Sequence, residues 1–349
     1  MSIRALLLLV LIAAGTTGAG AQGFAGLGTT AGGFKQVVRG TEFEFPKDYG
    51  PHPGFRIEWW YITANLETND GTPIGLQWTL FRQASRPDQK EETWSSSEFW
   101  MGHAAVTTEK DHLHAEKLAR GGSGQAGART DRIDAWIDDW AFHSTDEDKL
   151  ALSASGDRFS YSLTLNPTGR EIRHGDNGYS VKSDQGQASY YFSHPFLAIS
   201  GSVTIDGKDY AVAGNAWLDR EWSSQPLADN QEGWDWFSIK FDDGNRLMAF
   251  SLRDTSGENY VSGTWISADG LVTPLTSDEL SLMPLEQTPV ASKQIPTKWR
   301  LSLPSRKVDL RVSALNPRSW MATSIPYWEG PVTVSGSHKA KGYLEMTGY

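Results

Sequence analysis

The sequence of 349 residues contains no cysteine. Disulfide bonds are therefore excluded, and so is a lipid anchor attached to an N-terminal cysteine. Without disulfides, the folded chain must be stabilised by its hydrophobic core, and a chain of this length can bury a sizeable one.

Positive charge is also scarce, with 32 Lys and Arg against 42 Asp and Glu and a formal net charge of −10. This balance argues against a nucleic-acid partner, which requires clustered Lys and Arg. The motif G-x-S-x-G is absent as well, which argues against a serine hydrolase of the α/β type.

The only long apolar run lies at the start of the chain. Met1–Ala21 has a charged residue, Arg4, then the apolar run Ala5–Ala14, and then the small residues Ala19-Gly20-Ala21 before Gln22. This order is typical of a cleaved secretory signal, and the run is too short for a permanent membrane span. We therefore predict a periplasmic or secreted protein without a stable membrane anchor after cleavage.

The remaining composition favours an all-β protein. The chain has 15 Trp, 11 Tyr, 14 Phe and 35 Gly, and strand-forming segments alternate with turn residues. We predict a flexible leader at 22–40 and two β-domains at 41–200 and 201–349. Short strands are expected at Phe99–Thr107, Asp134–Phe142, Leu150–Ser155, Arg158–Leu165, Ser189–Phe192 and Lys307–Ser313.

The stretch Gly214–Ser224 concentrates charged and aromatic residues in what we predict to be a strand. Alternation of side chains would place Trp217, Asp219 and Glu221 on one face and Arg220 on the other. Carboxylates on a strand face must be neutralised, or they must line a wet cavity and perform chemistry. Both alternatives remain open from these residues alone.

Arg56–Leu66 and Pro73–Arg82 are predicted to form a hairpin around Asn69-Asp70-Gly71. One of its faces is apolar, and the other mixes aromatic side chains with hydroxyl and amide groups. Mixed faces are typical of ligand-holding barrels. The predicted binding residues on this hairpin are Trp59, Tyr61, Gln77 and Thr79.

A second hairpin, Gly233–Phe241 with Arg246–Arg253, resembles the first. Trp60-Tyr61-Ile62-Thr63 aligns with Trp236-Phe237-Ser238-Ile239, and both strands are followed by an Asp-Gly turn. We interpret the similarity as one β-domain used twice.

Two acidic residues near the C-terminus, Glu329 and Glu345, lie in apolar surroundings. We predict that they form structural ion pairs with Arg82, Arg220 or Arg253, because buried acids favour arginine donors. His112 and His114 are two residues apart, but no third ligand follows at a recognisable interval, so no metal site is predicted.

Several motifs in order resemble those of a known family. They are E-W-W-Y-x-T-A-x-L, G-x-Q-x-T-x-F-R, G-x-A-W-x-D-x-E-W-S, G-W-D-W-F, Y-W-E-G and G-Y-L-E-M-T-G-Y. Together they resemble the AttH-like secreted proteins, which are related to the CrtC-type carotenoid 1,2-hydratases. The resemblance covers about residues 40 to 349 and implies two tandem lipocalin-like antiparallel β-barrel domains.

The resemblance also implies a role for Asp219. The hydratase branch uses the aspartate of a Tyr-x-Asp motif as its acid, and Asp219 occupies that place, with Trp217 where the hydratases have tyrosine. That branch also uses a His-x-Trp pair upstream, and the nearest segment here, Tyr190-Tyr191-Phe192, has neither residue.

Two functions follow as hypotheses. In the first, the protein binds a hydrophobic, isoprenoid or lipid-like ligand and hydrates or otherwise transforms it by acid catalysis. Asp219 would act as the acid together with Glu221. The aromatic faces of Trp217, Trp234 and Trp236 would stabilise a cation. The second is a non-catalytic carrier, or an accessory protein of an inner-membrane ABC transporter, in which Asp219, Arg220 and Glu221 form an ion-pair network. Neither hypothesis requires a cofactor.

Overall fold

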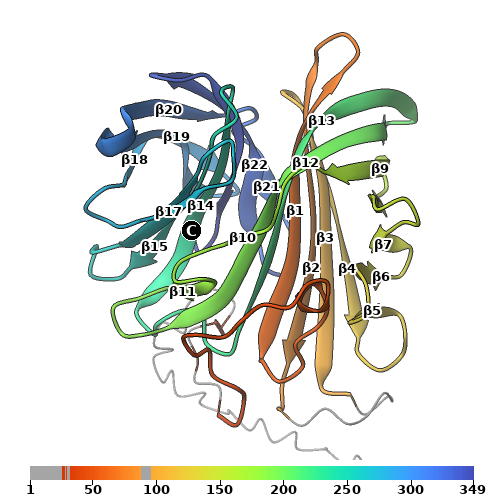
Figure 1. Ribbon diagram of the computed structural model, residues 1–349. Coiled ribbons are helices and arrows are strands. Elements are labelled where there is room, and N and C mark those ends of the chain that lie inside the picture. The colour runs from red at the N-terminus through yellow and green to blue at the C-terminus, as the bar shows by residue number, and fades with distance from the viewer. Residues whose placement is uncertain (1–25, 28, 30–31, 88–95) are drawn as a thin grey trace, which may run out of the picture.

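The computed structural model describes residues 26, 27, 29, 32–87 and 96–349. The predicted signal segment therefore lies outside the described residues. The fold is all-β, as predicted: two curled antiparallel sheets stand side by side, a near-barrel and a half-barrel (Figure 1). Two short 3₁₀ helices, η2 (Lys47–Tyr49) and η3 (Pro304–Arg306), are the helical elements of the described chain. That part of the chain contains no helix with the length and hydrophobicity needed to cross a bilayer.

The first sheet follows the order β4-β3-β2-β1-β13-β12-β9-β8-β7-β6-β5. Its strands are β1 (Ile57–Thr68), β2 (Pro73–Ala84), β3 (Glu98–Thr107), β4 (His112–Arg120), β5 (Ala126–Ala128), β6 (Asp134–Ile137), β7 (Trp140–Ser144), β8 (Leu150–Ser155), β9 (Phe159–Pro167), β12 (Ala188–Ile205) and β13 (Lys208–Ser223), with β10 (Ile172–Arg173) and β11 (Tyr179–Val181) paired to β12.

The second sheet follows the order β17-β16-β15-β14-β23-β22-β20-β19-β18. Its strands are β14 (Gln231–Phe241), β15 (Arg246–Asp254), β16 (Tyr260–Ile266), β17 (Val272–Leu275), β18 (Ser281–Val290), β19 (Lys293–Leu303), β20 (Val308–Ala314), β22 (Tyr327–Gly336) and β23 (Ala340–Met346), with β21 (Trp320–Met321) paired to β22.

The change from one sheet to the other falls between Ser223 and Gln231, later in the chain than the division at residue 200 expected from the sequence. The difference arises because β13 pairs with β1 from Val212 to Ser223, along the whole length of β1, and so belongs to the first sheet. Part of the expected leader is also packed, since Leu27 and Phe34 are buried.

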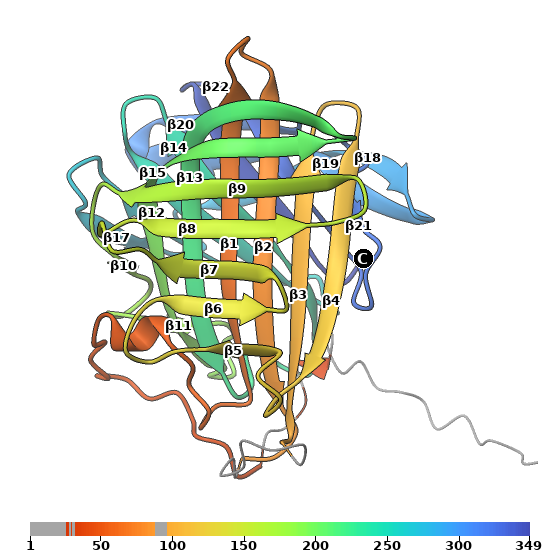
Figure 2. The same ribbon diagram turned by 90° about the vertical axis from the view of Figure 1, so that its right-hand side faces the viewer.

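The first sheet folds over onto itself. Strands β6 to β9 cross over β1 to β4 in a second layer, and the long strands β12 and β13 run from one layer into the other (Figure 2). A β-bulge between His194 and Leu197 interrupts the register of β12 with β13 near this corner. An apolar core fills the space between the layers and includes Trp60, Trp78 and Trp140, whose side chains are inaccessible to solvent.

One predicted strand is divided in two. Asp134–Phe142 was expected to be continuous, but β6 and β7 form a tight hairpin in which Ile137 pairs with Trp140. Asp138 has a φ of 51°, which aspartate tolerates better than most residues and which a two-residue turn of this kind requires.

The two sheets approach closely. The second sheet encloses its own apolar core, and a third apolar cluster lies between the sheets, with Tyr61, Trp217 and Trp236 among its members. Gly75 on β2 permits the contact, because a Cβ atom there would lie 2.3 Å from Cγ of Pro331 on β22. The mixed face of the first hairpin is therefore directed at the second sheet, not at the interior of the first barrel.

The strand orders support the internal repeat, but with a different alignment. In each sheet the last strand pairs with the first, β13 with β1 and β23 with β14. Tyr61 lies opposite Asp219, and Trp236 lies opposite Glu345, so Tyr61 rather than Trp60 corresponds to Trp236. The sequence alignment was one residue out, which in a strand exchanges the two faces: Trp60 lies in the first core and Trp236 between the sheets.

A buried ionic cluster forms on the other side of β1 and β13. Glu58 is inaccessible to solvent and accepts hydrogen bonds from Arg82, from Nη2 of Arg220 at 3.0 Å and from the backbone N–H of His52 at 2.9 Å. Burial opposes its charge, but Arg82, His52 and Arg220 together hold the pKa of Glu58 far below its usual range. Glu58 is therefore the counter-ion that two buried arginines share, and Arg82 also pairs with Glu98 at 3.1 Å.

We expect Glu58→Gln to lower the free energy of unfolding by about 3–5 kcal/mol, because it leaves two buried guanidinium groups without their shared counter-ion. Urea denaturation measures the loss. The matched control is Asp309→Asn, which breaks an exposed pair with Arg300 (Nε–Oδ1 2.8 Å) and should cost less than about 1 kcal/mol. Equal, small losses in both variants would contradict this account of the cluster.

Candidate active site between the two sheets

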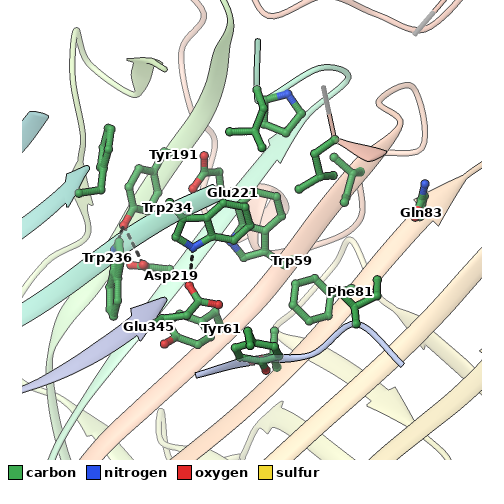
Figure 3. A pocket seen from close by; sticks show the side chains of 18 of the residues that line it. Trp59, Tyr61, Phe81, Gln83, Tyr191, Asp219, Glu221, Trp234, Trp236 and Glu345 are labelled. Atoms are coloured by element: carbon green, nitrogen blue, oxygen red, sulfur yellow. Dashed lines mark hydrogen bonds between the residues drawn. The ribbon is translucent and has the colours of Figure 1, made fainter. Parts of the chain in front are cut away.

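A cavity of about 120 Å³ lies between the two sheets, lined by residues from both (Figure 3). The first sheet contributes side chains of β1, β2, β3, β12 and β13, and the second contributes side chains of β14, β15, β22 and β23. Most of the wall is apolar, with Trp59, Phe81, Met101, Phe250 and Leu252 among its members. Polar side chains also line it, and three of them are carboxyl groups: Asp219, Glu221 and Glu345.

Asp219 is buried on β13 and holds three hydrogen bonds from neutral donors. Tyr191 donates its hydroxyl to Oδ2 at 2.7 Å, Trp217 donates its indole N–H to Oδ1 at 2.5 Å, and Ser193 donates to Oδ1. Among the described residues no Lys, Arg or His lies within ion-pair distance of Asp219. Burial raises the pKa of Asp219 to about 7 against the opposing effect of these three donors, and the charge of Glu221 adds to the rise.

A chain of hydrogen bonds continues behind Asp219. Ser193 Oγ lies 2.5 Å from Nε2 of His174, and Nδ1 of His174 lies 2.8 Å from the hydroxyl of Thr264 on β16. Burial holds the pKa of His174 well below its usual value, so the ring is neutral. A neutral imidazole that donates through Nε2 to Ser193 accepts from Thr264 through Nδ1, and this orients the serine hydroxyl toward Asp219.

Glu221 is neutralised, unlike Asp219. Lys182 lies 2.9 Å from its Oε1, and Ser189 donates a hydrogen bond to the same oxygen. The ammonium group of Lys182 also lies 4.4 Å from the ring centroid of Phe250 and 4.8 Å from that of Tyr191. A carboxylate with a close cation is a poor proton donor, so these contacts favour a positioning role for Glu221.

Glu345 faces the cavity from the second sheet. The indole N–H of Trp234 donates to its Oε2 at 2.8 Å, and the carboxyl lies close to Asp219 and Tyr61 (Figure 3). The apolar surroundings raise the pKa of Glu345 to about 7, and the nearby Asp219 and Glu221 add to the rise.

The predicted binding residues divide into two groups. Trp59, Tyr61, Thr79, Trp234 and Trp236 lie in the wall of the cavity. Gln77 and Trp217 are buried behind it: Gln77 hydrogen-bonds to Thr79 and lies 3.4 Å from the hydroxyl of Tyr327, whereas Trp217 bonds to Asp219.

The predicted ion pairs are partly different from those in the structure. Arg82 and Arg220 bind Glu58, and Arg253 binds Asp235 with Nη1 and Oδ1 2.7 Å apart.

Glu329 and Glu345 do not pair with these arginines. Glu329 accepts the hydroxyl hydrogen of Tyr61 at 2.6 Å, and Glu345 accepts from Trp234. The ion-pair network proposed for Asp219, Arg220 and Glu221 is also wrong, because alternation along β13 directs Arg220 to the opposite face.

A second polar chain reaches the cavity wall at Tyr327. Its hydroxyl lies 2.9 Å from Nδ1 of His103, whose Nε2 lies 3.1 Å from Oε1 of Glu116. The hydrogen bond with His103 contributes most to lowering the pKa of Glu116 to about 2. His112 and His114 lie beside this chain, where Thr107 bonds to His112 at 2.9 Å and the backbone of Ala322 to His114 at 3.2 Å.

The sequence analysis missed Lys182, Tyr191, Ser193 and His174 as neighbours of the two acids. Alternation in the predicted strand Ser189–Phe192 already places Ser189 and Tyr191 on one face. The sequence did not show that these residues lie beside the two acids, because this depends on the register of β12 with β13. In that register Tyr191 lies opposite Glu221 and Ser193 lies opposite Asp219.

Comparisons with known proteins agree with this architecture. A family model described as AttH-like matches residues 36–349. The crystal structure of a protein from Nitrosomonas europaea, described as AttH, is 35% identical, with a TM-score of 0.82 and coverage of 90% of this chain and 99% of that one.

The crystal structure of kievitone hydratase from Nectria haematococca is similar in fold, with 16% identity, a TM-score of 0.67 and coverage of 90% and 96%. No curated protein sequence matches the chain. The motifs, the two sheets and these matches together establish that the chain belongs to the AttH-like family.

Proposed function

We propose that this protein binds the isoprenoid end of a hydrophobic ligand between its two sheets and adds water to a carbon–carbon double bond there, with Asp219 as the proton donor. The observation that carries the proposal is the position of Asp219: a carboxyl group at the wall of an apolar cavity, bonded only to neutral donors among the described residues. Kievitone hydratase shares the fold, which makes hydration the favoured reaction class.

The size of the cavity favours a small reacting group. A cavity of about 150 Å³ lined by apolar side chains is known to hold a benzene molecule. The cavity here, about 120 Å³, suits a five-carbon prenyl unit, so we infer a ligand whose prenyl end enters the site.

Hydration of an isolated double bond requires an acid strong enough to protonate carbon. In the proposed step the Asp219 proton bonds to one alkene carbon, and the π electron pair forms the new C–H bond. The cation left on the neighbouring carbon faces the aromatic rings of Trp59, Trp236 and Phe250, which stabilise positive charge. Tyr191, Ser193 and Trp217 then stabilise the carboxylate that remains.

A non-catalytic carrier is the second candidate, favoured by the absence of the His-x-Trp pair from Tyr190-Tyr191-Phe192. Under this alternative the same cavity holds a lipid or isoprenoid for delivery, including delivery to an inner-membrane ABC transporter in the periplasm. Native mass spectrometry of the purified protein would identify a retained apolar ligand in either case.

We expect Asp219→Asn to lower turnover strongly while ligand binding persists. Prenylated phenols and acyclic isoprenoid alcohols are incubated with the protein in ¹⁸O-labelled water, and incorporation of labelled water is followed by mass spectrometry. Loss of the general acid should lower the rate by about 10²–10⁴-fold. The control Asp309→Asn, the same substitution at an exposed site, should keep the wild-type rate.

Retention of ligand by Asp219→Asn is measured by native mass spectrometry on the same samples. Absence of turnover by the wild type on every alkene tested, together with ligand retention, would favour the carrier. Wild-type rates in Asp219→Asn would remove Asp219 from the mechanism.

We expect the stability contributed by Asp219 to fall as pH rises. Its folded pKa of about 7 exceeds the unfolded value of 3.8, so between these values the folded state binds the extra proton and stability is lost on deprotonation. Between pH 5 and 8 the loss is about 2–3 kcal/mol. Urea denaturation of wild type and Asp219→Asn measures it as a difference, which removes the effect of groups that titrate alike in both proteins. A constant difference across this range would contradict a raised pKa.

A further inference from the structure

We infer that Glu345 is the second acid–base group of the site: it accepts the proton of the attacking water while Asp219 protonates the substrate carbon. This inference rests on the proposed hydration and adds to it a residue from the opposite sheet. Glu345 was expected from the sequence to form a structural ion pair, which the structure does not contain.

The first ground is the equivalent placement of the two carboxyl groups. Asp219 lies on β13, the last strand of its sheet, opposite Tyr61 on the first strand. Glu345 lies on β23, the last strand of the other sheet, opposite Trp236 on the first strand. The two repeats face each other across the cavity, and each contributes to it a carboxyl group without an ion pair among the described residues, Asp219 from the first and Glu345 from the second (Figure 3).

The second ground is the absence of a cation beside Glu345. Three other buried acids have one: Glu58 has two arginines, Glu221 has Lys182 and Asp235 has Arg253. Glu329 has no ion pair among the described residues, but it does not line the cavity and accepts a hydrogen bond from Tyr61. Among the described residues, Glu345 has no Lys, Arg or His within 4.0 Å, and Trp234 supplies a neutral hydrogen bond. A carboxyl group without a fixed counter-ion can exchange a proton during a reaction, whereas an ion-paired one resists it.

The charged and titratable groups around Glu345 come from both sheets. Asp219 and Glu221 face it across the cavity, and Glu329 lies directly opposite it on β22. Lys182, which lines the same cavity, is bound to Glu221, and the hydroxyl of Tyr61 is bound to Glu329. Close carboxyl groups in an apolar site do not ionise together, so Asp219 and Glu345 share one proton near neutral pH.

The shared proton defines the working state. Asp219 carries it and delivers it to the alkene carbon, and a water oxygen bonds to the neighbouring cationic carbon. Glu345, ionised, accepts a proton from that water, which leaves the alcohol product. Transfer of this proton from Glu345 back to Asp219 restores the starting state, so the net reaction consumes one alkene and one water.

The test is the pH profile of Glu345→Gln on a substrate that the wild type hydrates. Wild-type kcat/KM should be bell-shaped, falling at low pH as Glu345 is protonated and at high pH as Asp219 loses its proton. The variant should be about 10²–10³-fold slower and should lose the fall at low pH while keeping the fall at high pH. The control is Glu286→Gln, the same substitution on exposed β18 of the same sheet, which should retain the wild-type profile.

An unchanged low-pH limb, or a rate within about threefold of wild type, would overturn the role of Glu345. If the wild type hydrates no substrate, the hydration proposal fails, and infrared difference titration of the carboxyl groups still tests the pair. Two carboxyl groups should titrate around neutral pH. Glu345→Gln should remove the titration of Glu345 and lower the pKa of Asp219. Asp219→Asn should remove the titration of Asp219 and lower the pKa of Glu345. Independent titration of Glu345 at the ordinary value for glutamate would refute proton sharing.

Discussion

The pairing of β13 with β1 is the interaction on which the rest of the structure depends. It joins the last strand of the first sheet to the first strand, and so brings residues 144 to 166 positions apart in the sequence into register. The same pairing sets Asp219 beside Tyr61 and Glu221 beside Trp59. A register shift of one residue would direct both acids into the packed core and Arg220 toward the cavity, so the fold and the site are specified together.

Strand alternation assigns opposite electrostatic roles to neighbouring residues. Arg220 lies over the ring of Trp60, with its Cζ atom 3.8 Å from the ring centroid, and shares Glu58 with Arg82. Asp219, one residue earlier, receives only neutral hydrogen bonds. The first arrangement holds charge permanently inside the protein because cation and anion are matched. The second leaves a carboxyl group whose protonation responds to pH near neutrality, and such a group suits proton transfer.

The location of the cavity follows from how each sheet buries its apolar face. The near-barrel and the half-barrel each enclose an apolar core of packed side chains, which leaves little space for a ligand there. The opposite face of each sheet carries aromatic rings and polar groups. These two faces pack against each other and form a third apolar cluster. Two repeats that meet in this way supply a reactive group from each side, with aromatic rings between them. The internal repeat therefore provides a physical reason for a two-carboxyl site.

The sequence by itself determined the all-β class, most of the strands, the family and the position of Asp219 on a strand face with Trp217 and Glu221, because alternation and turn residues are local properties. It also indicated the aromatic wall, since Trp59, Tyr61, Trp234 and Trp236 alternate within their own strands. Only the tertiary structure decided which acids are neutralised. Lys182 reaches Glu221 and Glu58 holds two arginines, while Asp219 and Glu345 receive no cation among the described residues. These outcomes depend on strand register and on the approach of two sheets, and contacts between residues so distant in the chain leave no local pattern in the sequence.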